Sequence, residues 1–194
     1  MTPTARETAG ALYGLMRLIR LDAGGLAFFN ATYRGFWNSF WVAAAILPLH
    51  LLQAVIHFGQ SEHITVGPVT YFALELESYV IGWTLYPLVM VWVSGLIDRR
   101  QSFYAFMVPY NWFQLVVAAV ILPLSILGGL GLIPREAASL LMLMAASAVL
   151  LYMGFLAHKA LKVSGFTAFG VVLLDVLLSF LVNGTINQMV MGGP

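Results

Sequence analysis

Long apolar stretches separated by short charged segments dominate this chain. Five stretches can be drawn, each reaching the roughly 20 residues that a helix needs to cross the hydrocarbon layer of a membrane. They cover residues 37–58, 78–97 (with a helical extension back toward residue 68), 103–127, 137–157 and 166–191. The pattern predicts an all-α fold in which residues 36–194 form a polytopic transmembrane bundle of five spans.

The segment before the first span, residues 1–35, has a different pattern. Thr4 and Glu7 have the spacing of a capping box at the start of a helix over 5–23. Four apolar residues share one face of that helix: Leu12, Leu15, Met16 and Ile19. Three basic residues lie off this face or follow it: Arg17, Arg20 and Arg34. We therefore expect an amphipathic helix lying in the inner membrane interface with its basic residues toward anionic headgroups, or alternatively a docking helix for a partner.

Lys and Arg are distributed unevenly between the two sides of the predicted bundle. Eight of the nine fall on the side of the N-terminus, and only Arg135 falls on the other. The positive-inside rule then places the N-terminus in the cytoplasm and the C-terminus outside, which suits a bacterial inner (plasma) membrane protein. The net charge of +1 gives no reason to expect nucleic-acid binding.

Composition agrees with a membrane class and excludes several chemistries. The chain is 61% hydrophobic and 9% charged, whereas about 25% of the residues in a soluble domain are charged. Cysteine is absent, which excludes disulfides, thiolate metal sites and cysteine nucleophiles. No catalytic or nucleotide-binding motif is found. We expect a non-enzymatic protein without a cofactor that lies in the lipid bilayer, with other membrane proteins as further candidate partners and an undetermined oligomeric state.

One carboxylate interrupts the last span. Asp175 stands near its middle, and polar residues follow at steps of four along the same side of the helix. Two amides of the third span are expected at a similar depth, so we predict an intramembrane polar cluster: Asp175, Asn111, Gln114, Ser179 and Asn183. Such a cluster either fixes helix register through hydrogen bonds, with Asp175 bonded to Asn111, or binds a proton or cation.

A second polar group is expected near the outer surface, formed by Glu75, Glu77, His57 and His50. Glu75 and Glu77 are two residues apart, so on a helix they point about 200° away from each other. The group follows no recognised ligand spacing, and no metal site is predicted.

An N-terminal cytoplasmic segment, five spans and a very short tail on the far side together resemble the layout of the Yip1 family of small integral membrane proteins, and two local sequences add to this resemblance. The third span opens with Ser102-Phe103-Tyr104-Ala105 and has Pro109 one turn later; a basic link, His158-Lys159-Ala160-Leu161-Lys162, precedes a final span opening Gly165-Phe166-Thr167-Ala168. The resemblance implies a membrane-organising or partner-binding role without known chemistry.

Two functions follow from these patterns. The first is a non-enzymatic scaffold in which the polar cluster holds the helices together. The alternative is a small transporter or channel subunit that uses Asp175 to bind a proton or cation. The inner half of the last span, residues 169–174, carries no polar side chain to line a pathway, which favours the scaffold.

Overall fold

The part of the chain that the computed structural model describes, residues 2–192, is mostly helical, and no strand occurs there. The elements in order are α1 (Ala5–Ile19), the 3-10 helix η1 (Ala23–Phe28), α2 (Tyr33–Ser39), α3 (Trp41–Gln60), α4 (Pro68–Leu96), the 3-10 helix η2 (Arg100–Ser102), α5 (Phe103–Gly129), α6 (Arg135–Leu161) and α7 (Gly165–Met191). The predicted all-α fold is confirmed.

Five helical segments are long and apolar enough to cross a membrane. The first joins α2 and α3 across Phe40, and the others correspond to α4, to η2 with α5, to α6 and to α7. Their ends lie within a few residues of the predicted ends, except that α4 begins at Pro68, where the sequence predicted only a helical extension. The chain is therefore an integral membrane protein of five spans.

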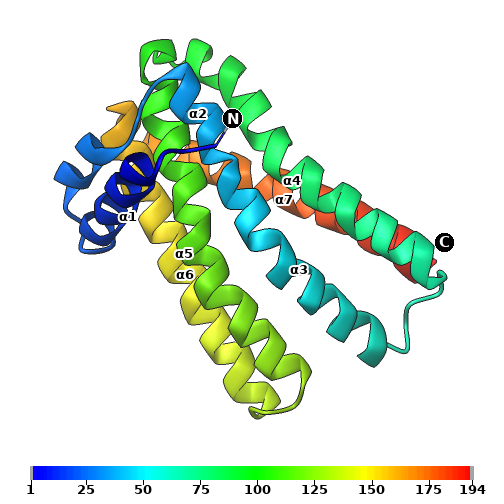
Figure 1. Ribbon diagram of the computed structural model, residues 1–194. Helices are drawn as coiled ribbons and strands as arrows, with labels where there is room; N and C mark the ends of the chain where they lie inside the picture. The colour runs from blue at the N-terminus through cyan, green and yellow to red at the C-terminus, as the bar shows by residue number, and fades with distance from the viewer. Residues whose placement is uncertain (1, 193–194) are drawn as a thin grey trace.

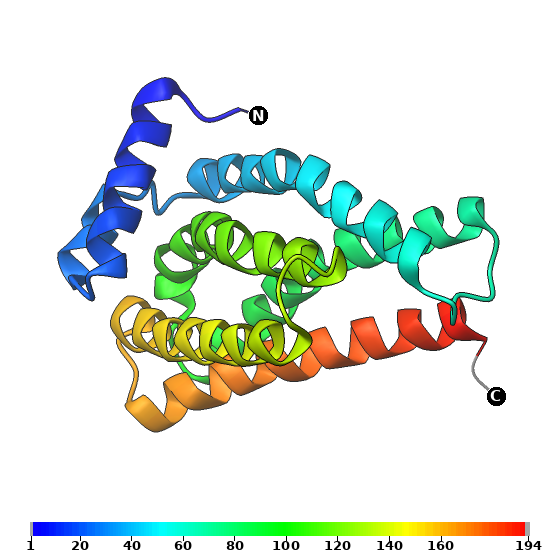
Figure 2. The same cartoon turned by 90° about the horizontal axis from the view of Figure 1, so that it is seen from below.

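The spans converge at one end and spread at the other (Figure 1). We call the end that carries α1, α2 and the starts of α5 and α7 the head end, and the opposite end the far end. The closest pairs are α5 with α6, α3 with α5, α6 with α7 and α4 with α7. After a turn of 90°, α3 lies along one side of the bundle and α7 along the other, with α5 and α6 between them (Figure 2).

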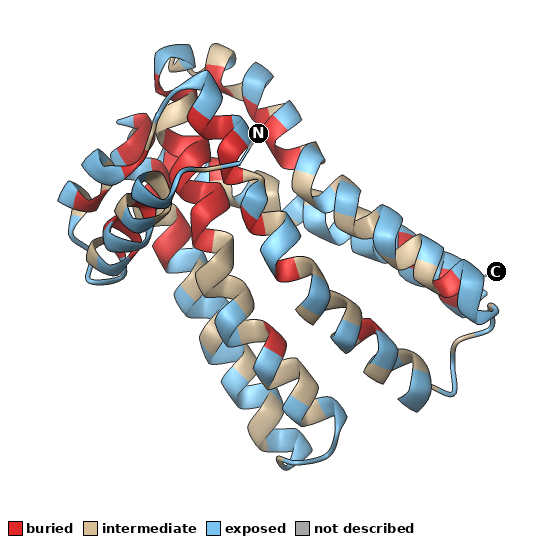
Figure 3. Cartoon of the chain, in the orientation of Figure 1, coloured by how far each residue is buried: buried red, intermediate tan, exposed pale blue. Residues whose placement is uncertain are grey.

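The packed core lies at the head end, where buried residues gather in Figure 3. Each span contributes at least one fully or nearly fully buried residue to it: Val42, Met90, Met107, Leu156 and Val171. Toward the far end the helices diverge, and many apolar side chains there are exposed. In a membrane these side chains would contact lipid, which costs nothing because lipid tails are equally apolar.

The headpiece, formed by α1, η1 and α2, packs across the head end. The Thr4 side chain caps α1 by accepting a hydrogen bond from the Glu7 backbone N–H at 3.2 Å. The Glu7 carboxylate accepts hydrogen bonds from the side chains of Asn30 at 3.1 Å and Asn38 at 2.9 Å. Because Asn38 belongs to α2, these bonds attach the amphipathic helix to the start of the first span.

The apolar face predicted for α1 is partly buried against the bundle and partly exposed. Leu15 is buried against the bundle together with Leu18, so the expectation that Leu15 contacts the membrane is wrong. The other three residues of that face are exposed: Leu12, Met16 and Ile19. One side of α1 packs against η1 and α5, so that side contacts protein.

The predicted end of this helix at residue 23 is also wrong. The helix ends at Ile19, and Leu21 has a φ of 58°. Arg17 then forms an ion pair with Asp22, with Nη2 and Oδ2 2.6 Å apart. The hydrogen bond from Arg17 lowers the pKa of Asp22 below its ordinary value of 3.8. Arg17 is thus used within the headpiece, whereas Arg20 and Arg34 are exposed.

Candidate functional site

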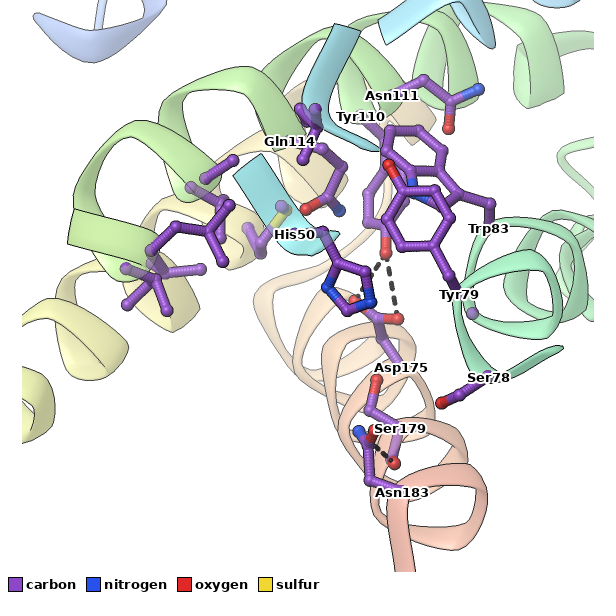
Figure 4. A pocket seen from close by; sticks show the side chains of 18 of the residues that line it. His50, Ser78, Tyr79, Trp83, Tyr110, Asn111, Gln114, Asp175, Ser179 and Asn183 are labelled. Carbon is purple, nitrogen blue, oxygen red and sulfur yellow. Dashed lines mark hydrogen bonds between the residues drawn. The ribbon is translucent and has the colours of Figure 1, made fainter. Parts of the chain in front are cut away.

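A cavity of about 380 Å³ lies between the five spans in the middle of the bundle. Its polar and aromatic lining comes from α3, α4, α5 and α7, while α6 adds apolar side chains. Figure 4 labels the polar and aromatic members: His50, Ser78, Tyr79, Trp83, Tyr110, Asn111, Gln114, Asp175, Ser179 and Asn183. All five members of the predicted intramembrane cluster line this one cavity.

The cavity is closed on the side of the head end. One turn beyond its lining in that direction, the helices carry buried side chains, among them Phe106 and Met107 on α5 and Leu156 on α6. On the side of the far end, Ser179 and Asn183 line the cavity and are exposed. The cavity therefore opens toward the far end.

Asp175 lies on α7 within this cavity and is half-buried. The hydroxyl of Tyr110 donates to its carboxylate, with the two oxygens at 3.0 and 2.9 Å (Figure 4). The predicted bond between Asp175 and Asn111 is wrong: adjacent residues of a helix point about 100° apart, and Tyr110 is the one that faces α7.

No cation among residues 2–192 pairs with Asp175. The two close contacts between a carboxylate and a basic side chain in this part of the chain, the Arg17–Asp22 ion pair and the approach of His50 to Glu75, do not include it. The cavity lining contains no Lys or Arg among these residues. A carboxylate that is partly removed from water and lacks a charged partner is costly, so the site favours a cation that comes from outside the chain.

Asn111 is almost completely buried, with 1% of its surface exposed. Its Nδ2 donates to the Ser39 hydroxyl at 2.8 Å, and that hydroxyl donates to the Phe36 carbonyl at 2.6 Å. The Asn111 side-chain oxygen has no hydrogen-bond partner among the described residues. Buried polar atoms are nearly always paired, so this oxygen is an exception; it has almost no accessible surface, and a ligand in the cavity would not reach it.

Aromatic side chains from α4 form one wall. The Tyr79 hydroxyl donates to the Ala43 carbonyl of α3 at 2.7 Å, which joins the two helices across the cavity. The Tyr79 ring lies 6.2 Å from Trp83 and 4.7 Å from the ring of His50. Few residues of α3 and α4 contact each other directly, and the Tyr79 hydrogen bond and the ring contact with His50 add to these contacts.

The predicted outer polar group is only partly assembled. His50 and Glu75 approach each other, with Nε2 and Oε2 3.6 Å apart, and His50 also joins the cavity lining. His57 contacts the Tyr71 hydroxyl at 3.1 Å, and Glu77 is exposed, away from Glu75 as expected. No three His, Asp or Glu side chains among the described residues are grouped closely enough to hold a metal ion.

The sequence did not single out Tyr110, Tyr79, Trp83 or Ser39 as site residues. Aromatic residues are common in membrane helices, and nothing in their spacing separates these from the others. One signal was present for Tyr110, since it lies four residues before Gln114 and so shares its helix face.

Comparisons with known proteins add no relative. No protein-family model matches the chain, and no curated protein and no solved structure matches it either. The resemblance to the Yip1 family stays a prediction, and function has to be argued from the geometry.

Proposed function

We propose that this protein is a carrier for a small solute and that the cavity around Asp175 is its binding site. The observation that carries the proposal is a cavity lined by all five spans, containing one carboxylate without a protein counter-ion and closed at one end only. Binding sites near the middle of the bundle, closed from one side at a time, are the common design of membrane carriers.

The apolar inner half of α7 supports this proposal rather than opposing it. Residues 169–174 lie on the head-end side of Asp175, and Val171 among them is buried in the packed core. A carrier needs a seal that excludes water on one side of the bound solute, and apolar side chains form such a seal. The sequence interpretation that favoured a scaffold required polar lining on both sides at once, which describes a channel and not a carrier.

The same proposal includes an orientation. With the N-terminus in the cytoplasm of a bacterial inner membrane, the cavity would face outward and the solute would enter from outside. The eight positive charges on the head-end side and the single Arg135 on the other support this orientation. We propose no catalytic activity.

A scaffold of the Yip1 type, bound to lipids or other membrane proteins, is the second candidate. One observation favours it: Tyr110 already bonds both oxygens of Asp175, as expected of a contact that holds α5 to α7. Under this alternative the cavity would be a packing defect without access to water from either side.

Cysteine accessibility tests the proposal directly, because the natural chain contains no cysteine. Ser179→Cys places one thiol in the cavity, and Phe180→Cys places one on the adjacent residue, which is 74% exposed and does not line the cavity. A charged, membrane-impermeant maleimide is applied from either side of oriented vesicles. We expect the Ser179→Cys thiol to react from both sides and the Phe180→Cys thiol, surrounded by lipid, to react from neither.

The alternatives give different patterns. Reaction at the Ser179 position from the far end alone would contradict a carrier and leave a binding site open to one side. Protection of that thiol from both sides would support the scaffold.

A further inference from the structure

We infer that the solute is a protonated amine, whose N–H groups bind the Asp175 carboxylate while an apolar body lies against the aromatic wall of α4. This inference rests on the cavity being a solute site, as proposed above, and names the class of solute that it takes.

The first step concerns the remaining capacity of the Asp175 carboxylate. An ionised carboxylate has about four acceptor positions. The single hydrogen of the Tyr110 hydroxyl is shared between its two oxygens, at 3.0 and 2.9 Å. Most of the acceptor capacity of Asp175 is therefore unused by the protein, and it lies in the lining of the cavity.

The second step excludes Asn111 as a further ligand of the solute. Its NH₂ group donates to Ser39, and its oxygen is buried with almost no accessible surface. Asp175 is therefore the acceptor that carries the inference.

The unused acceptor positions of Asp175, in a lining without Lys or Arg among the described residues, favour a cationic ligand that donates hydrogen bonds. An alkylammonium group carries up to three N–H donors and a positive charge, so it can bind both carboxylate oxygens and balance Asp175. An anion would meet only repulsion at this carboxylate. A bare metal cation is a poorer match, because hard cations take six or more oxygen ligands or keep their water.

The rest of the cavity suits an apolar body attached to the ammonium. Trp83 and Tyr79 present aromatic rings, which attract cations through their faces. Apolar side chains of α5 and α6 complete the lining, among them Val117, Leu122 and Met153. A volume of about 380 Å³ falls within the usual range for small-molecule sites.

A panel of isosteric probes tests the inference on the full chain in lipid nanodiscs. The probes are 2-phenylethylammonium, the neutral 2-phenylethanol, the anionic 3-phenylpropanoate, phenyltrimethylammonium (charged but without N–H donors) and sodium ion. Calorimetric titration gives each dissociation constant. We expect 2-phenylethylammonium to bind at least about tenfold more tightly than any other probe, because losing a charged hydrogen bond costs about one factor of ten or more.

Substitutions locate the binding. Asp175→Asn should weaken binding of 2-phenylethylammonium by about tenfold or more. Asp98→Asn is the matched control, because Asp98 is a carboxylate of the link between α4 and η2 and is not part of the cavity; it should change nothing. Equal binding of the neutral alcohol, or unchanged binding in Asp175→Asn, would overturn the inference.

A second variant covers the case in which Asp175→Asn fails to fold. Ser179→Lys places an ammonium one helical turn from Asp175, where it can pair with that carboxylate. It should weaken amine binding about tenfold more than Ser179→Gln, which adds similar bulk without charge. Equal binding by the two variants would overturn the inference.

Failure of the inference and failure of the carrier proposal are distinguishable. If the Ser179→Cys thiol reacts from both sides while the amine does not bind preferentially, the carrier stands and the solute class is wrong. If the amine binds through Asp175 while that thiol reacts from one side only, the binding site stands and the carrier is wrong.

Discussion

Replacing Tyr110 with Phe removes one hydroxyl from the centre of the bundle and leaves the aromatic ring in place. That hydroxyl bonds both oxygens of Asp175, at 3.0 and 2.9 Å. The ring stays packed against Tyr86, whose centroid is 4.8 Å away, so Tyr110→Phe opens almost no new cavity. The change in stability then reports mainly on the lost hydrogen bond.

The size of that change depends on whether Asp175 carries a charge. Hydrogen bonds between membrane helices contribute ~0.6 kcal/mol on average. A hydrogen bond to an ionised group contributes about 1.5 to 3 kcal/mol. Because the cavity opens toward the far end and no protein cation replaces the bond, we predict the larger range for Tyr110→Phe.

A double-mutant cycle isolates this contact from other effects of the substitution. Asp175→Asn keeps an acceptor of similar size but removes the charge, so Tyr110→Phe should cost much less in the Asp175→Asn background. Reversible unfolding in mixed detergent micelles, followed by tryptophan fluorescence, gives the four free energies of unfolding. We expect a coupling energy of at least ~1.5 kcal/mol between Tyr110 and Asp175.

A neutral contact in the same bundle serves as the control. Gln53 of α3 donates to the Ser125 hydroxyl of α5 at 2.8 Å, and neither group carries a charge. Its cycle should give a coupling near ~0.6 kcal/mol. A Tyr110–Asp175 coupling no larger than that of this control would refute an ionised Asp175 and with it the basis for an ammonium ligand.

Three further predictions concern the headpiece. Leu15→Glu should destabilise the protein by several kcal/mol, because Leu15 is 3% exposed. Ile19→Glu, at a residue that is 51% exposed, should change the free energy of unfolding by less than about 0.5 kcal/mol. Equal effects of the two substitutions in thermal unfolding would show that α1 does not pack on the bundle. Gly25→Ala should cost about 1 to 3 kcal/mol in the same assay, since a Cβ there would lie 2.6 Å from a backbone oxygen of α1. The hydrogen bond with Arg17 lowers the pKa of Asp22 in the folded protein, so ionised Asp22 stabilises the fold at pH values above the ordinary pKa of 3.8, and this stabilisation is lost as the pH falls below it. In Arg17→Ala the free energy of unfolding should no longer fall in this way across that pH range. A pH profile identical to that of the natural protein would contradict the ion pair.

The spans could be predicted from the sequence because a membrane imposes one local requirement on each of them. A segment such as 166–191 must be about 20 residues long, apolar and helical whatever its neighbours are, since no water is present to bond its backbone. The same reasoning indicated that Asp175 must avoid lipid, and the structure places it in a cavity together with Asn111 and Gln114.

The partners of these residues depended on the tertiary structure. A depth along the membrane normal leaves the rotation of each helix about its axis undetermined, and neighbouring residues of a helix point about 100° apart. That rotation decided that Tyr110, and not Asn111, bonds Asp175. It also decided that Leu15 contacts protein while Ile19 does not, because an apolar helix face looks the same in sequence whether it lies on lipid or on a bundle.

The cavity itself has no signature in the sequence. It exists because the five helices pack tightly at the head end and diverge toward the far end, and that divergence is a property of all the helix contacts together. Apolar residues fill the seal and the lipid-facing surface alike, so hydropathy could not separate the two. Composition and periodicity thus determined which segments enter the membrane. The packing of the helices alone decided that they enclose a cavity, because side-chain contacts between helices, rather than burial in lipid, set the rotation and spacing of each helix.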